Sequence, residues 1–523
     1  MANLIKSQSL QGKLVGLTRT KFYKQLSWLT SPKNLSWLAI ALGVVFRLVQ
    51  YASNRSLWAD EAVLALNIID RSFLELLQPL DYDQGAPVGF LMIEKLAVQA
   101  LGNHEYALRL FPLLTGIAAL FLLYELAKRC LPWQAIPIAL LLFASSKHVI
   151  YYASEVKQYS SDIAIALLSS LLATNLLAQK LRTRQLLLIS VVGGISIWFS
   201  HPAIFVLAGV GTLVLLLKLV EGERENALKI SMVQGTWLLS FLVCYLISLR
   251  DLSSNQDLLT SWGDAFPASP FDLLWFLDAL GKFFYQPLGF AGPFDVLAIL
   301  VFLAGCASYG KKNLKTLLVL LSPILVTLLA ACLQKYPFQA RLVLFLIPFF
   351  ILLMAEGLTY LRTRRSMWLS GVGTVLLVCL LAPPLLDASQ LLVKPKLREE
   401  IKPVIAYVRE HQQPEDVLYI FQRGEYQFKY YAERYGYQKG DYIIGVDDLD
   451  QYDQQKEVSA AEWKRYQADL DQLRGNPRVW LLFSHSLLKQ ENEMIQTYLN
   501  QIGQRIDSFE RPGAFVYLYN LQK

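Results

Sequence analysis

The chain has 523 residues, of which 54% are hydrophobic and 17% are charged, and its mean hydropathy is +0.35. This is more apolar material than a soluble domain can place inside its core, which excludes an ordinary globular protein and indicates a membrane protein. The net charge of +7 reflects basic residues between the apolar segments and gives no argument for nucleic-acid binding.

Apolar segments of about 16 to 23 residues recur between Asn34 and Leu385, and a helix needs about 20 apolar residues to cross the roughly 30 Å of a bilayer's hydrocarbon. After Leu385 this pattern stops. We therefore predict a polytopic all-α membrane module over residues 35–385, followed by a soluble domain over residues 386–523. About eleven transmembrane helices are expected, at 35–52, 105–127, 133–152, 161–179, 186–200, 202–217, 230–249, 292–307, 317–332, 342–361 and 367–385.

The first 34 residues carry basic side chains and no Asp or Glu. The basic residues are Lys6, Lys13, Arg19, Lys21, Lys24 and Lys33. Because Lys and Arg in short segments stay on the cytoplasmic side, we expect this basic N-terminus (residues 1–34) to be cytoplasmic. It lacks a small-residue cleavage site, and the apolar segment that follows is long. The first helix is therefore expected to act as a signal anchor that is not removed.

The apolar segment 86–101 could form a twelfth transmembrane helix, but the charge of the later loops argues against it. If it does not cross, the later cytoplasmic loops are all basic, whereas if it crosses they all lie outside. The segment opens with Pro87 and contains adjacent Glu94 and Lys95, which suits a helix lying on the membrane surface. If segment 86–101 does not cross the membrane, loops 53–104 and 250–291 and the soluble domain lie on the outer side, and the functional site is expected there.

The soluble domain alternates helix-like and strand-like patterns, which predicts a layered α/β domain. We predict helices at 396–411, 425–435, 460–473 and 491–502, strands at 416–421, 442–446 and 478–484, and two closing strands that include 514–519. The domain has neither a Gly-rich phosphate loop nor a nucleophile elbow, which favours a lid or a platform for acceptor docking. The five cysteines all precede it, so no disulfide framework is expected.

Two adjacent carboxylates, Asp60 and Glu61, follow Trp58 a few residues beyond the outer end of the first predicted helix. One interpretation is structural, because acidic side chains in the first turn of a helix are favoured by its dipole. The functional interpretation is a carboxylate that acts as general base on an acceptor hydroxyl or amine. The residues alone leave both interpretations open.

A second group of polar residues, Glu155, Lys157, Tyr159 and Asp162, lies between the third and fourth predicted helices. Charges at this depth are costly unless they are paired or used. A Glu155–Lys157 ion pair at the membrane interface is the structural alternative. In the functional alternative, Lys157 meets a lipid phosphate, and Glu155 or Asp162 faces the cavity that contains Asp60.

Three further residues are candidates on the outer side. His201 precedes Pro202 in a tight hairpin, where a lone His is as often structural as functional. Arg341 begins the tenth predicted helix and, as a cation that can be buried, suits a phosphate. Lys95, on the surface segment 86–101, is a third cation that could bind the phosphate of a lipid-linked donor.

Four short motifs resemble the N-terminal module of GT-C membrane glycosyltransferases. The most similar group is glycosyltransferase family 39, the bacterial relatives of dolichyl-phosphate-mannose protein mannosyltransferases. The motifs are Trp58-Ala-Asp60-Glu61-Ala, Ala86-Pro87-Val-Gly-Phe-Leu, Glu105-Tyr-Ala-Leu-Arg109-Leu-Phe-Pro112 and Ser154-Glu155-Val-Lys157-Gln-Tyr159. The resemblance covers residues 35–385 and is strongest across 56–165. It implies a transferase that moves a sugar from a polyprenyl-phosphate carrier to an acceptor outside the membrane, with inversion at the anomeric carbon.

The resemblance also implies roles for individual residues. Asp60 matches the catalytic base of the family's first outer loop, and Glu155 and Tyr159 match the acid-and-aromatic motif of the second. Arg341 matches an arginine that is thought to meet the carrier phosphate. Two positions depart from the family's pattern: Ala86-Pro87 stands where Pro-Pro is frequent, and Lys157 stands where Arg is frequent. Lys keeps the charge but loses bidentate phosphate binding.

The implied chemistry requires no cofactor, because the donor is already activated and needs only cations at its phosphate and a carboxylate at the acceptor. Asp60 with Glu155 or His201 could ligate a divalent metal, although no recognisable metal spacing is present. The expected partners are a polyprenyl-phosphate sugar donor, a protein, lipid or glycan acceptor, and membrane lipid, with no nucleic acid. The expected location is the plasma (inner) membrane of a bacterial cell.

Two other functions suit a helical bundle with buried charges. A transporter or lipid flippase often shows two similar halves, which this sequence lacks, and it does not need a large exported domain. An inactive scaffold of the same fold is the other alternative.

Overall fold

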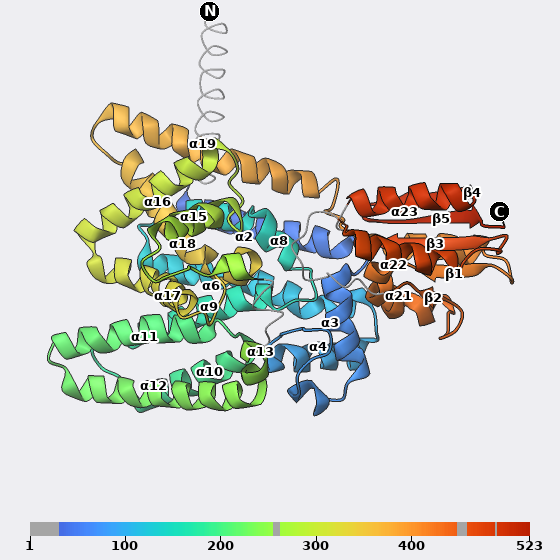
Figure 1. Ribbon diagram of the computed structural model, residues 1–523. Coiled ribbons are helices and arrows are strands. Elements are labelled where there is room, and N and C mark those ends of the chain that lie inside the picture. Colours follow the sequence, from blue (N-terminus) through green and yellow to red (C-terminus); the bar gives the residue numbers. More distant parts are fainter. Residues whose placement is uncertain (1–30, 255–261, 447–457, 487–488, 523) are drawn as a thin grey trace, which may run out of the picture.

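The computed structural model describes residues 31–254, 262–446, 458–486 and 489–522. In this part of the chain, helices from α2 to α19 form a bundle, and a small mixed sheet with its own helices lies at one end of it (Figure 1). The predicted fold class is confirmed: a multi-pass, mostly helical membrane module is followed by an α/β domain. The prediction for the basic N-terminus concerns residues 1–30 above all, which lie outside the described residues.

Eight helical segments within the described residues are long and apolar enough to cross a membrane. They are formed by α2 (Pro32–Ala52), α5 (Glu105–Leu108) with α6 (Leu110–Cys130), α11 (Ala203–Val220), α12 (Arg224–Cys244) with η2 (Tyr245–Leu249) and the start of α13 (Arg250–Ser254) as far as Leu252, α16 (Pro293–Lys312), α17 (Leu314–Cys332), η4 (Ala340–Leu346) with α18 (Ile347–Arg362), and α19 (Met367–Leu391). Helices α16 and α18 cross closely, since a Cβ atom on Gly305 would lie 1.9 Å from the carbonyl oxygen of Leu353.

The remaining predicted spans are helical but shorter. The span predicted at 133–152 is broken at Ser145 and Ser146 into α7 (Ile136–Ala144) and α8 (Lys147–Tyr152), and the hydroxyl of Ser145 donates to the carbonyl of Leu141 at 2.7 Å. Helices α9 (Tyr159–Asn175) and α10 (Thr183–Phe199) follow. The number of membrane crossings stays a prediction.

The loop after α2 contains α3 (Ala59–Asp70), η1 (Glu75–Leu77) and α4 (Val88–Leu101). The 14 residues of α4 make a helix of about 21 Å, which is shorter than the hydrocarbon layer. Its length therefore fits the predicted surface helix. The later long loop contains α13 (Arg250–Ser254), η3 (Gly263–Ala265) and α15 (Leu273–Tyr285), while residues 255–261 lie outside the described part.

The C-terminal domain places five described strands in one sheet of order β2-β1-β3-β5-β4, in which β2, β1 and β3 are parallel and β5 and β4 are antiparallel to their neighbours. Its elements are α20 (Ile401–His411), β1 (Val417–Ile420), η5 (Gln422–Gly424), α21 (Glu425–Ala432), η6 (Glu433–Tyr435), β2 (Ile443–Ile444), α22 (Ala460–Asp471), β3 (Val479–Ser484), α23 (Lys489–Ile502), β4 (Gln504–Arg511) and β5 (Ala514–Asn520). The helix predicted to begin at 396 begins at Ile401, because residues 396–400 form an extended linker.

The two faces of this sheet belong to different cores. Alternate residues of β3 point to opposite sides, as a strand requires. Leu481 and the other β3 residues on its face pack with α22 and α23. Trp480 and Leu482, on the opposite face, pack with α20, α21 and apolar residues of α3 and α4. The loop after α2 and the C-terminal domain therefore share one hydrophobic core, and α3 lies at the junction of the bundle and the sheet domain (Figure 1).

Candidate active site

Asp60 and Arg341 form an ion pair at this junction. Asp60 lies in the first turn of α3, and Arg341 lies at the start of η4. Arg341 Nη1 is 2.6 Å from Asp60 Oδ2, and both side chains are about one-quarter exposed. The central guanidinium carbon of Arg341 also lies 5.7 Å from the ring centre of Trp58 and 5.9 Å from that of Tyr159. The structure thus brings together the predicted base and the predicted phosphate ligand.

The loop between α8 and α9 contributes Glu155 and Lys157, which do not pair with each other. Trp58 Nε1 donates to Glu155 Oε1 at 2.7 Å. Lys157 Nζ donates to Gln84 Oε1 at 2.7 Å, and its charge acts on Asp60. In place of an interfacial Glu155–Lys157 pair, the structure shows two contacts to the loop after α2.

Glu61 is fully buried in a network that connects α3 to the loop between α8 and α9. Arg109 donates to both of its oxygens, from Nε at 2.9 Å and from Nη2 at 2.7 Å. The backbone N–H of Val156 donates to Glu61 Oε1 at 2.8 Å, and Arg55 Nη2 lies 3.9 Å from the same oxygen. The bond from Val156 holds the loop of Glu155 against α3, and the bonds from Arg109 occupy the rest of the carboxylate. This geometry suits a positioning role for Glu61, and its catalytic role stays a prediction.

The three carboxylates of the site, Asp60, Glu61 and Glu155, have different electrostatic environments. Burial acts to raise the pKa of Asp60, but cations led by Lys157 and Arg341 outweigh it and hold the pKa below its usual range. Burial also opposes ionisation of Glu61, and the ion pair with Arg109 again reverses the effect and lowers the pKa. Burial and the charge of Glu61 raise the pKa of Glu155 to about 7. Near neutral pH, Asp60 is ionised while Glu155 titrates.

The other predicted site residues take different places. Tyr159 lies beside Arg341, and its ring packs edge-on against Tyr152 at 5.0 Å. Asp162 is buried one turn further along α9, and His201 lies in the turn before α11. Lys95 lies elsewhere: its Nζ donates to the carbonyl of Ile69 at 2.9 Å, near the other end of α3 from Asp60.

The C-terminal domain fixes the backbone that leads into Asp60. Glu399 Oε2 accepts from the N–H of Ala59 at 3.0 Å, and the Glu400 carboxylate accepts from the N–H of Ser56 at 3.2 and 3.3 Å. The hydroxyl of Tyr431 accepts from the N–H of Leu57 at 2.8 Å, and the side chain of Gln427 donates to the carbonyl of Leu57 at 2.9 Å. The extended segment 56–59 is thus held residue by residue.

Two cations of the linker, Lys396 and Arg398, were not predicted as part of the site. The central guanidinium carbon of Arg398 lies 3.3 Å from the ring centre of Trp58, and Lys396 Nζ lies 4.9 Å from that of Tyr151. The available signal was the run of charged residues directly after the last predicted span, which we interpreted as the start of a helix.

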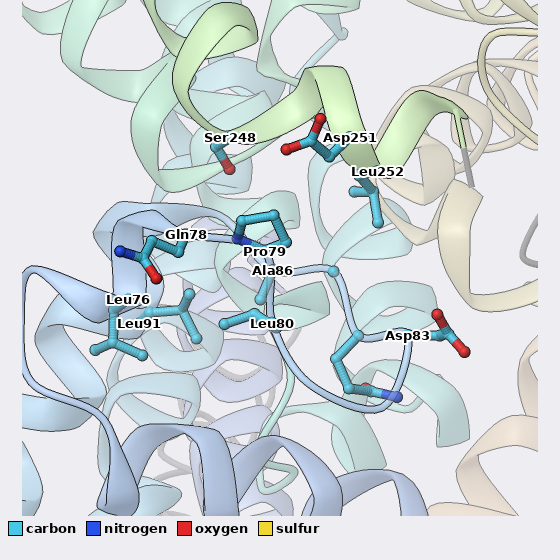
Figure 2. Close-up of a pocket in the computed structure, with 12 residues that line it drawn as sticks. Leu76, Gln78, Pro79, Leu80, Asp83, Ala86, Leu91, Ser248, Asp251 and Leu252 are labelled. Carbon is cyan, nitrogen blue, oxygen red and sulfur yellow. The ribbon is translucent and has the colours of Figure 1, made fainter.

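A cavity of about 180 Å³ lies between the loop 76–91 and the residues around α13 (Figure 2). Figure 2 shows Ser248, Asp251 and Leu252 on one side and Pro79, Leu80 and Ala86 on the other. Gln84, which accepts from Lys157, also lines this cavity, whereas Asp60, Glu155 and Arg341 do not. Within the described residues, no group of three or more His, Cys, Asp and Glu side chains could hold a metal ion.

Comparison with solved structures identifies the fold. ArnT from Cupriavidus metallidurans bound to undecaprenyl phosphate aligns with a TM-score of 0.54 and 11% identity, covering 92% of this chain and 97% of that one. The apo state of the same protein gives a TM-score of 0.51 over the same shares, also at 11% identity. The Archaeoglobus fulgidus oligosaccharyltransferase tethered with an acceptor peptide aligns with a TM-score of 0.50 and 11% identity, covering 94% of this chain and 74% of that one.

These neighbours are GT-C superfamily membrane glycosyltransferases, so the chain has the GT-C fold that the outer-loop motifs predicted. At this level of identity the likeness defines the fold and leaves the reaction to be argued from the site. No family model matches the chain, and no curated protein sequence matches it.

Proposed function

We propose that the protein is a membrane glycosyltransferase that moves a sugar from a polyprenyl-phosphate-linked donor to an acceptor on the outer face of the plasma membrane, with Asp60 as general base. The observation that carries this proposal is the Asp60–Arg341 ion pair, a carboxylate and a cation held 2.6 Å apart in a chain with the GT-C fold. The undecaprenyl phosphate bound by the neighbouring ArnT supports the class of carrier.

In this mechanism the acceptor's hydroxyl or amine attacks the anomeric carbon of the sugar and gives its proton to Asp60. The bond between the anomeric carbon and the phosphate oxygen breaks, and the phosphate leaves with the electron pair. Arg341 and Lys157 stabilise the negative charge that develops on the phosphate. Because attack and departure occur on opposite faces of the carbon, the configuration inverts.

The ion pair also provides an order of events. While Asp60 is paired with Arg341, its pKa is low and it is a weak base. A carrier phosphate bound to Arg341 and Lys157 adds negative charge beside Asp60, which raises the pKa of Asp60. Donor binding therefore strengthens the base before the acceptor is deprotonated.

The proposal is tested with purified protein in liposomes that contain a polyprenyl-phosphate sugar labelled in the sugar. An extract of envelope glycans and proteins is supplied as acceptor. A transferase moves the label from the lipid into the acceptor fraction and leaves free carrier behind. A transporter or flippase moves the labelled lipid between leaflets without separating sugar from carrier, and this result would contradict the proposal.

Glu155 predicts the pH dependence of donor binding. Its carboxyl is neutral below a pKa of about 7 and negative above it, and the negative form repels the carrier phosphate. The KM for the donor should therefore rise as the pH increases from 6 to 8, by about tenfold, whereas a Glu155→Gln protein should keep the low value throughout. The check is a pH series of initial rates, and a similar rise of KM in the Gln variant would contradict this role.

A further inference from the structure

The linker between α19 and α20 passes directly over the outer-loop residues of the site and is fixed there. The backbone of Lys396 makes two hydrogen bonds to the side chain of Gln50 near the end of α2. The Lys396 carbonyl accepts from Gln50 Nε2 and the Lys396 N–H donates to Gln50 Oε1, both at 3.0 Å. Three and four residues later, Glu399 and Glu400 hold the backbone of Ala59 and Ser56. The backbone that carries Lys396 and Arg398 is therefore anchored on both sides.

The two cations of this linker rest on aromatic rings. Arg398 stacks on Trp58 and Lys396 lies over Tyr151. The carboxylate of Glu399 is 3.9 Å from Arg398, but its oxygens are already used by Ala59, Gln427 and His485, the last at 2.9 Å. The charge of Arg398 also acts on Asp60, and that of Glu155 acts on Lys396, but no described carboxylate lies closer to either cation than the 3.9 Å between Glu399 and Arg398.

The like charges are also close to one another. Burial lowers the pKa of Lys396, and repulsion from Arg398, Lys147 and Arg55 lowers it further, while Glu155 acts in the opposite direction. Cations that repel one another in a fixed arrangement gain free energy when an anion binds between them. The linker is thus suited to an anion, in a position set by Trp58 and Tyr151.

This position is next to the proposed carrier phosphate. Arg398 and Arg341 both contact the ring of Trp58, so their guanidinium carbons are no farther apart than the sum of 3.3 and 5.7 Å. Two guanidinium groups at such a separation can hold neighbouring phosphates of one diphosphate, because each N–H···O bond adds about 3 Å. A single phosphate held by Arg341 and Lys157 leaves the linker cations without an anion.

We propose that Lys396 and Arg398 form a second phosphate subsite, so that the donor is a sugar linked to a polyprenyl diphosphate. Arg341 and Lys157 take the phosphate bonded to the sugar, and the linker cations take the phosphate bonded to the lipid. This inference rests on the proposed function and replaces its carrier monophosphate by a diphosphate. In the transfer step the bond between the anomeric carbon and the oxygen of the sugar-linked phosphate breaks, the acceptor's proton goes to Asp60, and polyprenyl diphosphate leaves with the electron pair.

The test measures binding of undecaprenyl phosphate and undecaprenyl diphosphate to the full chain in nanodiscs. The wild-type protein should bind the diphosphate at least about tenfold more tightly. A Lys396→Ala/Arg398→Ala protein should lose this preference while binding the monophosphate as the wild type does. Lys394→Ala, in the same linker and exposed, is the matched control and should keep the preference.

Other outcomes separate the alternatives. Equal wild-type affinities, or a preference that survives in the double variant, would overturn the second subsite but leave the proposed function standing, whereas binding of neither carrier counts against the proposed function itself. If the double variant binds neither carrier, a Lys396→Met protein, which keeps the aliphatic stem over Tyr151, provides the test. Weaker binding of the diphosphate with unchanged binding of the monophosphate supports the subsite, and any other result overturns it. Saturation of the linker cations by inorganic phosphate, with no preference between carriers, would assign them to a free anion and overturn the carrier assignment.

Discussion

An Asp60→Asn protein should insert and fold like the wild type but transfer sugar about a thousandfold more slowly, since a positioned general base contributes roughly 10²–10⁴ to the rate. Asn keeps the size of the side chain and cannot accept the acceptor's proton. The loss should appear in kcat, measured as label transferred from a polyprenyl-phosphate-linked sugar under donor saturation.

The effect of this variant on the donor distinguishes a base from a binding residue. Removing the charge of Asp60 frees Arg341 from its ion pair, so the KM for the donor should stay unchanged or fall. Asp70→Asn, at the exposed end of the same helix α3, is the matched control and should transfer normally. Normal transfer by the Asp60→Asn protein would remove Asp60 from the mechanism.

A Glu61→Gln protein should lose about 3 kcal/mol of stability, because the change leaves the buried guanidinium of Arg109 without its counter-charge. Arg109 and Glu61 are both almost fully buried, so water cannot replace the lost interaction. The measurement is the thermal unfolding midpoint of the detergent-solubilised protein, together with the yield of folded protein.

The matched control is Glu125→Gln, which removes the exposed ion pair between Glu125 and Lys128 and should change stability by less than about 0.5 kcal/mol. The folded fraction of Glu61→Gln should keep a kcat within a few-fold of the wild type, because Glu61 positions the loop of Glu155 and does not touch the reacting atoms. A stable Glu61→Gln protein with a kcat as low as that of Asp60→Asn would instead support the predicted catalytic role.

Most elements of the fold follow from local patterns and could be predicted from them. Apolar segments of membrane length became helices, and the alternation of short apolar strands with amphipathic helices became the C-terminal sheet domain. The break between α7 and α8 was not predicted, because apolar residues continue on both sides of Ser145 and Ser146. The late start of α20 was also missed, since Lys396 is fixed by Gln50, 346 residues away.

In the candidate site, too, residue types could be predicted from the sequence and contacts between distant segments could not. Asp60, Glu155 and Arg341 were selected by residue type and by their place at the outer ends of predicted helices, and the structure brings them together around Trp58. The difference between Asp60 and Glu61 could not be predicted, because it depends on Arg109 and Val156 closing around one carboxylate only. The place of Lys95 at the far end of α3 likewise follows from how α4 packs against α3.

The contacts between the C-terminal domain and segment 56–59 can form only late in the synthesis of the chain. The ribosome makes Asp60 early, but Glu399, Glu400, Gln427 and Tyr431 leave it only near the end of synthesis. A chain that stops after its last membrane helix has Asp60 without the contacts that hold segment 56–59. If Asp60 is the base proposed above, we expect such a chain to transfer no sugar until the C-terminal domain has folded on the loop.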